Sequence, residues 1–385
     1  MTIQHLARRD FARSLVAAPF LIPGLAHTQE PAGPWVDART FGAVGDGTHD
    51  DAPAIQAAIA SVRGGGCVVL PPGQFALGDS IRIPSRVLVR GVGSRATELL
   101  YRRKDGNVVE MGDGTHDVSG AGLQGLRING AGTAGSGIRC YYLTNGTFVR
   151  DVEVVAAGTG VQLTKAWYAG FENVRVRDGV RGRGWDIRSP SGSEQVNSVA
   201  FVACQAHGCG AEGFYIEVGR GCSFISCQSE KTGRQAFLVA RGGGTVVVDC
   251  YAETNGTAME SPATVQVGTG RRIFGFTMLG GYLRGPAGGD TIRVGRADAV
   301  QILGTALEIE AVDRRPAHHL AVDDDARDVR FEPAIISGAA GSNTTGPVAG
   351  ATAPNVETRP GHPASYAPVY LDRATGGFYV LGGSS

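Results

Sequence analysis

The middle of the chain contains carboxylates whose spacing suits acid catalysis. A repeat of about two dozen residues would place Asp186 and Glu217 on neighbouring coils, two residues apart in register, with Glu212 and Glu230 as alternatives. Two carboxylates about 5 to 9 Å apart can hydrolyse a glycosidic bond, one as the acid and the other as base or nucleophile. Asp186 with Glu217 is therefore the expected pair if the chain is a hydrolase.

The same region also contains cations beside possible bases. Arg188 or Arg177 could neutralise a uronate carboxylate, and Tyr215 or His207 could take the proton from the neighbouring carbon. This combination supports β-elimination, because the cation stabilises the charge that develops as the proton leaves. The basic residues favour elimination, and hydrolysis stays open. The predicted catalytic residues are Asp186, Tyr215, Glu217, His207 and Arg188.

Positive charge is concentrated in these coils. Five arginines fall within 14 residues: Arg175, Arg177, Arg181, Arg183 and Arg188. The planar guanidinium fork binds carboxylate and sulfate through two hydrogen bonds, so the expected partner is an acidic polysaccharide or oligosaccharide. The alternative is solubilising charge that acidic neighbours neutralise in weak surface pairs. The predicted substrate-binding residues are Arg177, Lys165, Glu212, Glu230, Glu253 and Arg241.

Similar segments recur between residues 123 and about 310. They begin at Leu123, Val149, Phe171, Phe201, Phe224, Val247, Phe276 and Val300, with steps of 26, 22, 30, 23, 23, 29 and 24. Each segment reads as a short strand followed by a turn and a second strand. One such repeat cannot bury its own apolar edge, so the pattern predicts a stacked solenoid of parallel β-helix type.

Stacking turns positions in the repeat into surface columns. The first strand predicts the outward column Asn129, Val155, Arg177, His207, Glu230, Glu253 and Tyr282. The second strand predicts one outward column of Arg139, Gln162, Asp186, Tyr215, Leu238, Gln266 and Arg293. Its next outward column is Tyr141, Thr164, Arg188, Glu217 and Ala240. Loops at Ser189 to Val196 and Thr257 to Ala263 are expected to wall a cleft beside them.

The seven cysteines indicate packing rather than metal binding. Cys204, Cys227 and Cys250 share one repeat position, so they are expected to stack as a buried ladder of free thiols. A bridge between Cys209 and Cys222 is left open. The odd cysteine count and the absence of a CxxC pair argue against both a disulfide framework and a zinc site, so no metal site or cofactor is predicted. Calcium is possible, but no run of acids, including Asp323 to Asp325, has the ligand spacing.

Overall charge and the first residues bear on partners and location. The formal net charge is zero, which argues against nucleic-acid or membrane-surface binding by bulk electrostatics. Arg8 and Arg9 precede an apolar run from Leu15 to Leu25, as in a twin-arginine signal peptide covering residues 1–26. We therefore expect a bacterial protein that is periplasmic or secreted, without stable membrane insertion. An uncleaved anchor is the alternative.

The segment after this signal resembles a known superfamily. From Phe41 the sequence reads FGAVGDGTHDD, then AIQAAIASV, GGGCVVLPPGQFAL from Gly64 and IRIPSRVLVRGVG from Ile81. These motifs, over residues 36 to 95, are similar to the opening of the pectate-lyase-like superfamily, which includes rhamnogalacturonase-like and polygalacturonase-like proteins. The resemblance implies an all-β, single-stranded right-handed parallel β-helix with an N-terminal capping helix, and polysaccharides as the class of substrate.

The resemblance identifies no catalytic residue, because the NTD, GHG and RIK triplets of the hydrolases and the RxPxxR segment of calcium-dependent pectate lyases are missing. Residues 36–330 are expected to form the β-helix, and residues 331–385 an irregular tail that ends in a hairpin. The predicted function is an exported lyase or hydrolase acting on a uronate-containing polysaccharide. A non-catalytic glycan-binding or adhesion module and a polymer-level epimerase are alternatives. The sequence specifies no oligomeric state.

Overall fold

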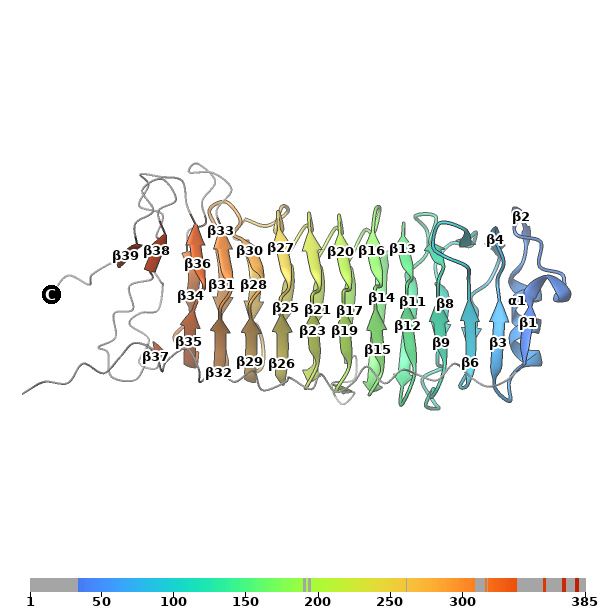
Figure 1. Cartoon of the computed structure of the whole chain (residues 1–385), viewed down its shortest axis with the longest axis horizontal. Helices are drawn as coiled ribbons and strands as arrows, with labels where there is room; N and C mark the ends of the chain where they lie inside the picture. The colour runs from blue at the N-terminus through green and yellow to red at the C-terminus, as the bar shows by residue number, and fades with distance from the viewer. Residues whose placement is uncertain are drawn as a thin grey trace, which may run out of the picture.

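The chain forms a rod of stacked β-coils (Figure 1). The computed structural model describes residues 34–189, 192, 195–260, 262–308, 316 and 318–337, with short strands at 356–357, 369–371 and 378–380. The predicted signal peptide and most of the predicted tail lie outside these residues. Each regular coil contains three strands, so the rod has three faces. We number the faces in the order in which the chain visits them.

Face 1 and face 3 belong to one 25-stranded parallel sheet. Face 1 contains β1 (Trp35–Asp37), β3 (Gly66–Val69), β6 (Val87–Arg90), β9 (Gly122–Gln124), β12 (Phe148–Arg150), β15 (Gly170–Glu172), β19 (Ala200–Val202), β23 (Ser223–Ile225), β26 (Gly242–Val248), β29 (Ile273–Leu279), β32 (Ala297–Leu303), β35 (Arg327–Glu332) and β37 (Val356–Glu357). Face 3 contains β5 (Ile81–Ile83), β8 (Asn107–Met111), β11 (Ser136–Leu143), β14 (Thr159–Trp167), β17 (Trp185–Arg188), β21 (Phe214–Ile216), β25 (Phe237–Val239), β28 (Ala263–Val267), β31 (Asp290–Val294) and β34 (His318–Val322).

The two faces form one sheet because some strands continue around the corner between them. The long strand β14 pairs with β17 on face 3 and, through Ala166 and Trp167, with the corner strand β18 (Val196–Asn197). A second corner strand, β22 (Gly219–Arg220), pairs with the first residues of β26. The corner between face 3 and face 1 is therefore continuous backbone.

Face 2 is a separate 12-stranded parallel sheet. It contains β2 (Asp46–Asp50), β4 (Gly73–Leu77), β7 (Thr97–Tyr101), β10 (Arg127–Asn129), β13 (Glu153–Val155), β16 (Arg175–Arg177), β20 (Gln205–His207), β24 (Gln228–Glu230), β27 (Tyr251–Glu253), β30 (Tyr282–Arg284), β33 (Ala306–Glu308) and β36 (Ile335–Ser337). Beyond it, β38 (Val369–Leu371) and β39 (Phe378–Val380) form an antiparallel pair. The all-β solenoid predicted from the repeat is confirmed.

Little of the described chain is helical. A 3-10 turn, η1 (Ala38–Phe41), precedes the α-helix α1 (Ala52–Ser61), which lies at the N-terminal end of the rod (Figure 1). One side of α1 is apolar and packs against the rod, because Ile55 and Ile59 are buried. Asp50 accepts a hydrogen bond from the Ala52 amide, whereas Asp51 accepts those of Val44 and Gly45. No helix in the described ranges has the length and apolar character to cross a bilayer.

The interior is built from ladders of like side chains. Phe171, Phe201 and Phe224 stack with ring centroids 5.2 and 4.6 Å apart, close to the strand spacing. Beside them Trp185, Phe214 and Phe237 form a second ladder, also fully buried. Identical positions in successive coils are strand neighbours, so a repeated aromatic necessarily becomes a stack.

The cysteine ladder is confirmed. Cys204, Cys227 and Cys250 are buried, and the Cys227 amide donates a hydrogen bond to Cys250 Sγ over 3.3 Å. Cys209 and Cys222 are both buried free thiols, so the alternative of a bridge between them is wrong. Burial raises the pKa of Cys209 to about 12. These cysteines pack as small apolar side chains.

Candidate functional site

The predicted column on the first strand lies on face 2. Asn129, Val155, Arg177, His207, Glu230 and Glu253 are register neighbours in that order, one in each coil from β10 to β27. The residues that the sequence placed side by side are therefore lateral neighbours on the rod.

The last member of this column is wrong. Tyr282 pairs with Tyr251, and Arg284 instead follows Glu253, to which it forms a 2.9 Å ion pair. The predicted step from Val247 to Phe276 is two residues too short, because Val247 pairs with Met278. A shift of two residues leaves the inward and outward alternation of a strand unchanged, so the apolar pattern does not detect it.

The central part of face 2 combines a histidine with two glutamates. His207 Nε2 lies 4.0 Å from Glu230 Oε2, and the two side chains are 29% and 17% exposed. Gln228 Nε2 donates a hydrogen bond to the other oxygen of Glu230. Glu253 lies on the next strand, in register with Glu230. A proton-accepting group and two carboxylates thus reach solvent along one line.

Two tyrosines lie beside this line. Tyr251 and Tyr282 stack with centroids 5.0 Å apart and an interplanar angle of 11°. Burial raises the pKa of Tyr251 to about 12, helped by its hydrogen bond to Glu253 and by the charges of Glu253 and Glu230. Tyr251 is therefore protonated at neutral pH. The stacked rings provide a platform on which the apolar face of a sugar could pack.

Arginines continue the face toward the N-terminus. Three guanidinium groups surround the nearly buried Glu153, those of Arg127, Arg175 and Arg177, at 3.7, 3.8 and 4.0 Å. Arg177 also pairs with Asp178 at 2.7 Å, and this bond raises the pKa of Arg177. Arg177 is the register neighbour of His207. A cation and a possible base are therefore adjacent on face 2.

The predicted columns of the second strand lie on face 3. The register runs through Arg139, Gln162, Asp186, Tyr215, Leu238, Gln266 and Arg293 as predicted. In the neighbouring column, Tyr141, Thr164 and Arg188 also pair in order. The predicted catalytic residues are thus divided, with His207 on face 2 and the other four on face 3.

Asp186 and Glu212 of face 3 are covered, although Asp186 occupies an outward position on β17. Asp186 is 0% exposed and forms ion pairs with Arg183 at 3.1 Å and with Arg188. Glu212 is also buried, 2.8 Å from Arg183 and 3.1 Å from Arg234. Long arginine side chains lie over these carboxylates. Their oxygens are already engaged.

The remaining predicted residues of face 3 also have partners. The Arg183 guanidinium lies 3.5 Å from the centre of the Tyr215 ring, and burial raises the pKa of Tyr215. Glu217 accepts hydrogen bonds from the Ser189 amide at 3.1 Å and from Arg241 at 3.2 Å. Lys165 Nζ lies 3.3 Å from the centre of the Tyr142 ring. Each of these three residues therefore already contacts another side chain.

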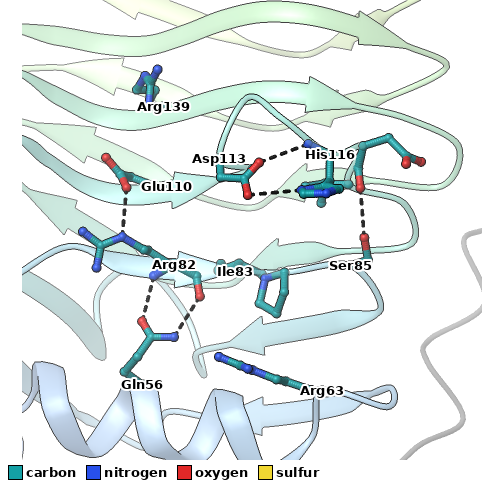
Figure 2. A pocket seen from close by; sticks show the side chains of 13 residues that line it. Gln56, Arg63, Arg82, Ile83, Ser85, Glu110, Asp113, His116 and Arg139 are labelled. Atoms are coloured by element: carbon teal, nitrogen blue, oxygen red, sulfur yellow. Dashed lines mark hydrogen bonds and ion pairs between the residues drawn. The ribbon is translucent and has the colours of Figure 1, made fainter.

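A hollow at the N-terminal end of face 3 escaped the sequence interpretation. It has a volume of about 580 Å³, and Figure 2 shows Arg82, Glu110 and Arg139 on successive strands, with Arg63 and His116 at its sides. Arg82, Glu110 and Arg139 are register neighbours, so they extend the Asp186 column toward the N-terminus. Their steps of 28 and 29 residues were the signal that could have revealed them.

Hydrogen bonds hold several of the residues that line this hollow in place. Gln56 of α1 forms hydrogen bonds to the carbonyl and amide of Arg82 (Figure 2). Asp113 accepts the amides of Thr115 and His116, and these bonds hold its pKa well below the usual range. No group of three or more histidines, cysteines or acids suited to a metal ion occurs among the described residues.

Comparisons with known proteins agree with this architecture. Residues 35–118 match the family model described as rhamnogalacturonase A/epimerase, pectate lyase-like. A 58-residue stretch is 48% identical to the pre-neck appendage protein of Bacillus phage B103. This stretch makes up 15% of this chain and 6% of the phage protein. The chain thus spans only a small part of that curated relative.

Solved structures resemble most of the rod at low sequence identity. The A-module of a mannuronan C-5 epimerase from Azotobacter vinelandii superposes with a TM-score of 0.52 and 17% identity, covering 80% of this chain and 90% of the module. An alginate lyase from Paenibacillus gives 0.52 and 14%, covering 76% and 94%. Gene product 12 of bacteriophage phi29 gives 0.56 and 16%, covering 80% of this chain and 53% of the phage chain. At this identity the likeness concerns the fold.

Proposed function

We propose that this parallel β-helix protein, whose residues 35–118 match a pectate-lyase-like family model, is a carbohydrate-active enzyme that cleaves a uronate-containing polysaccharide on face 2. The observation that carries the proposal is the alignment of Arg177, His207 and Glu230 on successive strands with their side chains partly exposed. Two of the structural neighbours are, by their names, an alginate lyase and a mannuronan epimerase.

The proposed reaction is β-elimination. Arg177 binds the uronate carboxylate, and His207 removes the proton at C5. The electron pair of that C–H bond forms the C4–C5 double bond, and the glycosidic C4–O bond breaks. Tyr251 keeps its proton at neutral pH and can give it to the leaving oxygen. Glu230 positions His207 through their 4.0 Å contact.

Face 3 has a structural role in this proposal. Asp186 and Glu212 form ion pairs with arginines from the turns and are buried, so they are not open to a substrate. A carboxylate that is enclosed by two guanidinium groups is out of reach of a substrate, so neither acid suits a catalytic role. Among the predicted catalytic residues, His207 is therefore the one we assign to the reaction.

Hydrolysis is the second candidate function. Glu230 and Glu253 are register neighbours, so their backbones lie about 4.8 Å apart, close to the carboxylate separation of about 5 to 5.5 Å in retaining glycosidases. In that reaction one glutamate would attack the anomeric carbon and the other would protonate the leaving oxygen. Glu253 is the nucleophile in this candidate reaction, because Arg284 lies 2.9 Å from it, whereas Glu230 lies beside His207.

A panel of alginate, pectate and glucuronan distinguishes these reactions. Elimination produces ultraviolet absorbance from the new double bond, whereas hydrolysis produces reducing ends without it. Epimerisation shares the proton removal at C5 and would change uronate composition without either signal. Binding without any of these changes would identify a non-catalytic glycan-binding module.

Substitutions on face 2 and face 3 then test the assignment of catalysis to face 2. His207→Ala and Tyr251→Phe should abolish the activity found, while Glu217→Gln on face 3 should retain it. Activity that survives in the first two variants and disappears in the third would overturn the assignment to face 2.

We also propose that residues 1–26 direct export through the twin-arginine pathway to the periplasm or beyond. The support is the Arg8–Arg9 pair ahead of an apolar run. Replacing both arginines with lysine in the full chain should leave the protein in the cytoplasmic fraction. Unchanged export of that variant would contradict the proposal.

A further inference from the structure

A second hollow lies at the corner between face 3 and face 1. It has a volume of about 450 Å³, and its walls include Arg220, Arg241, Arg271, Arg272 and Phe274. Each coil visits face 1, then face 2, then face 3, so this corner is the one that does not border face 2. The hollow is therefore separate from the proposed catalytic residues, and its capacity to bind a ligand does not depend on them.

Glycines create the hollow. Arg220 is the register neighbour of Gly243, and Gly243 is the register neighbour of Phe274. Arg220 and Phe274 thus lie two strand spacings apart, about 10 Å, with bare backbone between them. A side chain at Gly243 would meet the Phe274 carbonyl oxygen at 2.6 Å, and one at Gly242 would meet the Gly219 carbonyl oxygen at 2.0 Å. The backbone packing thus keeps the floor free of side chains.

Among the described residues, the charged side chains that line the hollow are all arginines. Arg241 pairs with Glu217 at 3.2 Å, and Arg272 pairs with Asp298 at 2.5 Å. Arg220 and Arg271 are exposed, and neither has an ion-pair partner within the described ranges. Two guanidinium groups therefore remain available for an anion.

An exposed ring completes the site. Phe274 is 60% exposed, one of few large apolar side chains on the described surface with that exposure. A phenyl ring beside guanidinium groups suits a ligand with both a flat apolar face and an acidic group. A pyranose ring bearing a carboxylate or a sulfate has both. A volume of about 450 Å³ lies within the range of about 300 to 1,000 Å³ found for small-ligand sites.

We infer that this corner binds an acidic sugar residue, stacked on Phe274 over the Gly242–Gly243 backbone, with its acidic group held by Arg220 and Arg271. Because the hollow lies on the flank of the rod, the bound residue can belong to a longer chain that continues past it. The site would hold an acidic polysaccharide at a distance from face 2.

Titration calorimetry of the full-length mature protein tests this site. The probes are trigalacturonate, a sulfated disaccharide, neutral maltotriose and a nucleoside monophosphate. Arg220→Ala and Arg271→Ala should each weaken binding of the acidic sugar by about tenfold, as expected for the loss of a charge-assisted contact. Phe274→Ala should weaken it several-fold. Arg95→Ala and Tyr168→Ala change an exposed arginine and an exposed aromatic elsewhere, and should bind as the wild type does.

The outcomes separate this site from face 2. Loss of one binding site in Arg220→Ala/Arg271→Ala, with the melting temperature and any activity on short substrates unchanged, supports the inference. Full binding in that double variant overturns it, as does tighter binding of the nucleotide or of maltotriose. Whether the carboxylated or the sulfated sugar binds better identifies the source of the negative charge. If the face 2 variants had no effect on activity, the binding results for this corner would still hold, because the two sites are separate.

Discussion

Face 2 and face 3 both carry acidic side chains next to basic ones, but these side chains differ in their exposure to solvent. On face 2, His207, Glu230 and Glu253 stand in one line and remain partly exposed. On face 3, Asp186 and Glu212 are enclosed by arginines and buried. The comparison shows that an outward strand position is not necessarily a surface position, because side chains from the adjoining turns can cover it.

The turns account for the difference. Arg183 comes from the turn before β17 and contacts Asp186, Glu212 and the Tyr215 ring at once. Arg234, from the turn before β25, covers the other oxygen of Glu212. On face 2 the charged partners stand on the strands themselves and extend side by side. Glu230 and Glu253 remain partly exposed there, whereas Glu153 is enclosed by three arginines of the strands.

The largest expected effect is a difference in kcat between a variant of face 2 and a variant of face 3. His207→Ala should lower kcat by about 10² to 10⁴, the usual contribution of a general base. Glu217→Gln should change kcat by less than about threefold, since it only removes the charge that pairs with Arg241 on face 3. Initial rates on the active uronate polymer measure both. Equal losses in the two variants would remove the distinction between the faces.

The next effect separates them by stability. Asp186→Ala should lower the free energy of unfolding by about 3 to 5 kcal/mol, because Arg183 and Arg188 would lose a fully buried counterion. Glu230→Gln on the partly exposed face should change it by about 1 kcal/mol or less. Urea unfolding followed by circular dichroism gives both values. A similar cost at the two positions would contradict the contrast in burial.

A smaller effect concerns the tyrosine platform. Tyr282→Ala should raise KM about threefold to tenfold, because stacking on an aromatic ring contributes about 0.5 to 1.5 kcal/mol. Tyr215→Ala is the matched change on face 3 and should leave KM unaltered. If Tyr215→Ala raised KM and Tyr282→Ala did not, the glycan would bind face 3.

The smallest effect is a pH dependence. The pKa of Tyr251 rises from 10.0 to about 12 on folding, so the folded state keeps the phenol proton longer than the unfolded state does. The corresponding stability is fully present below pH 10 and is lost as the pH rises toward 12. In the Tyr251→Phe variant, the urea midpoint should change less as the pH rises from 10 to about 12. An unchanged slope in the variant would show that Tyr251 does not cause it.

Much of the fold could be predicted because the repeat acts through local rules. The Phe201 and Phe224 segments are 23 residues apart and form a stack, as do their cysteines. Where the rule is ambiguous the prediction was wrong, as for Tyr282, since a two-residue shift preserves the alternation. The extension of the face 3 column to Arg82 and Glu110 was missed because the N-terminal coils lack the aromatic signature.

The amino-acid sequence by itself determined the solenoid and nearly all lateral neighbours, because strand spacing and side-chain alternation follow directly from the length of each repeat. The tertiary structure alone decided which of those neighbours reach solvent. Coverage of Asp186 by Arg183 and Arg188, and the bare backbone between Arg220 and Phe274, depend on how turns and strands pack across coils. No periodic pattern encodes the paths of those long side chains.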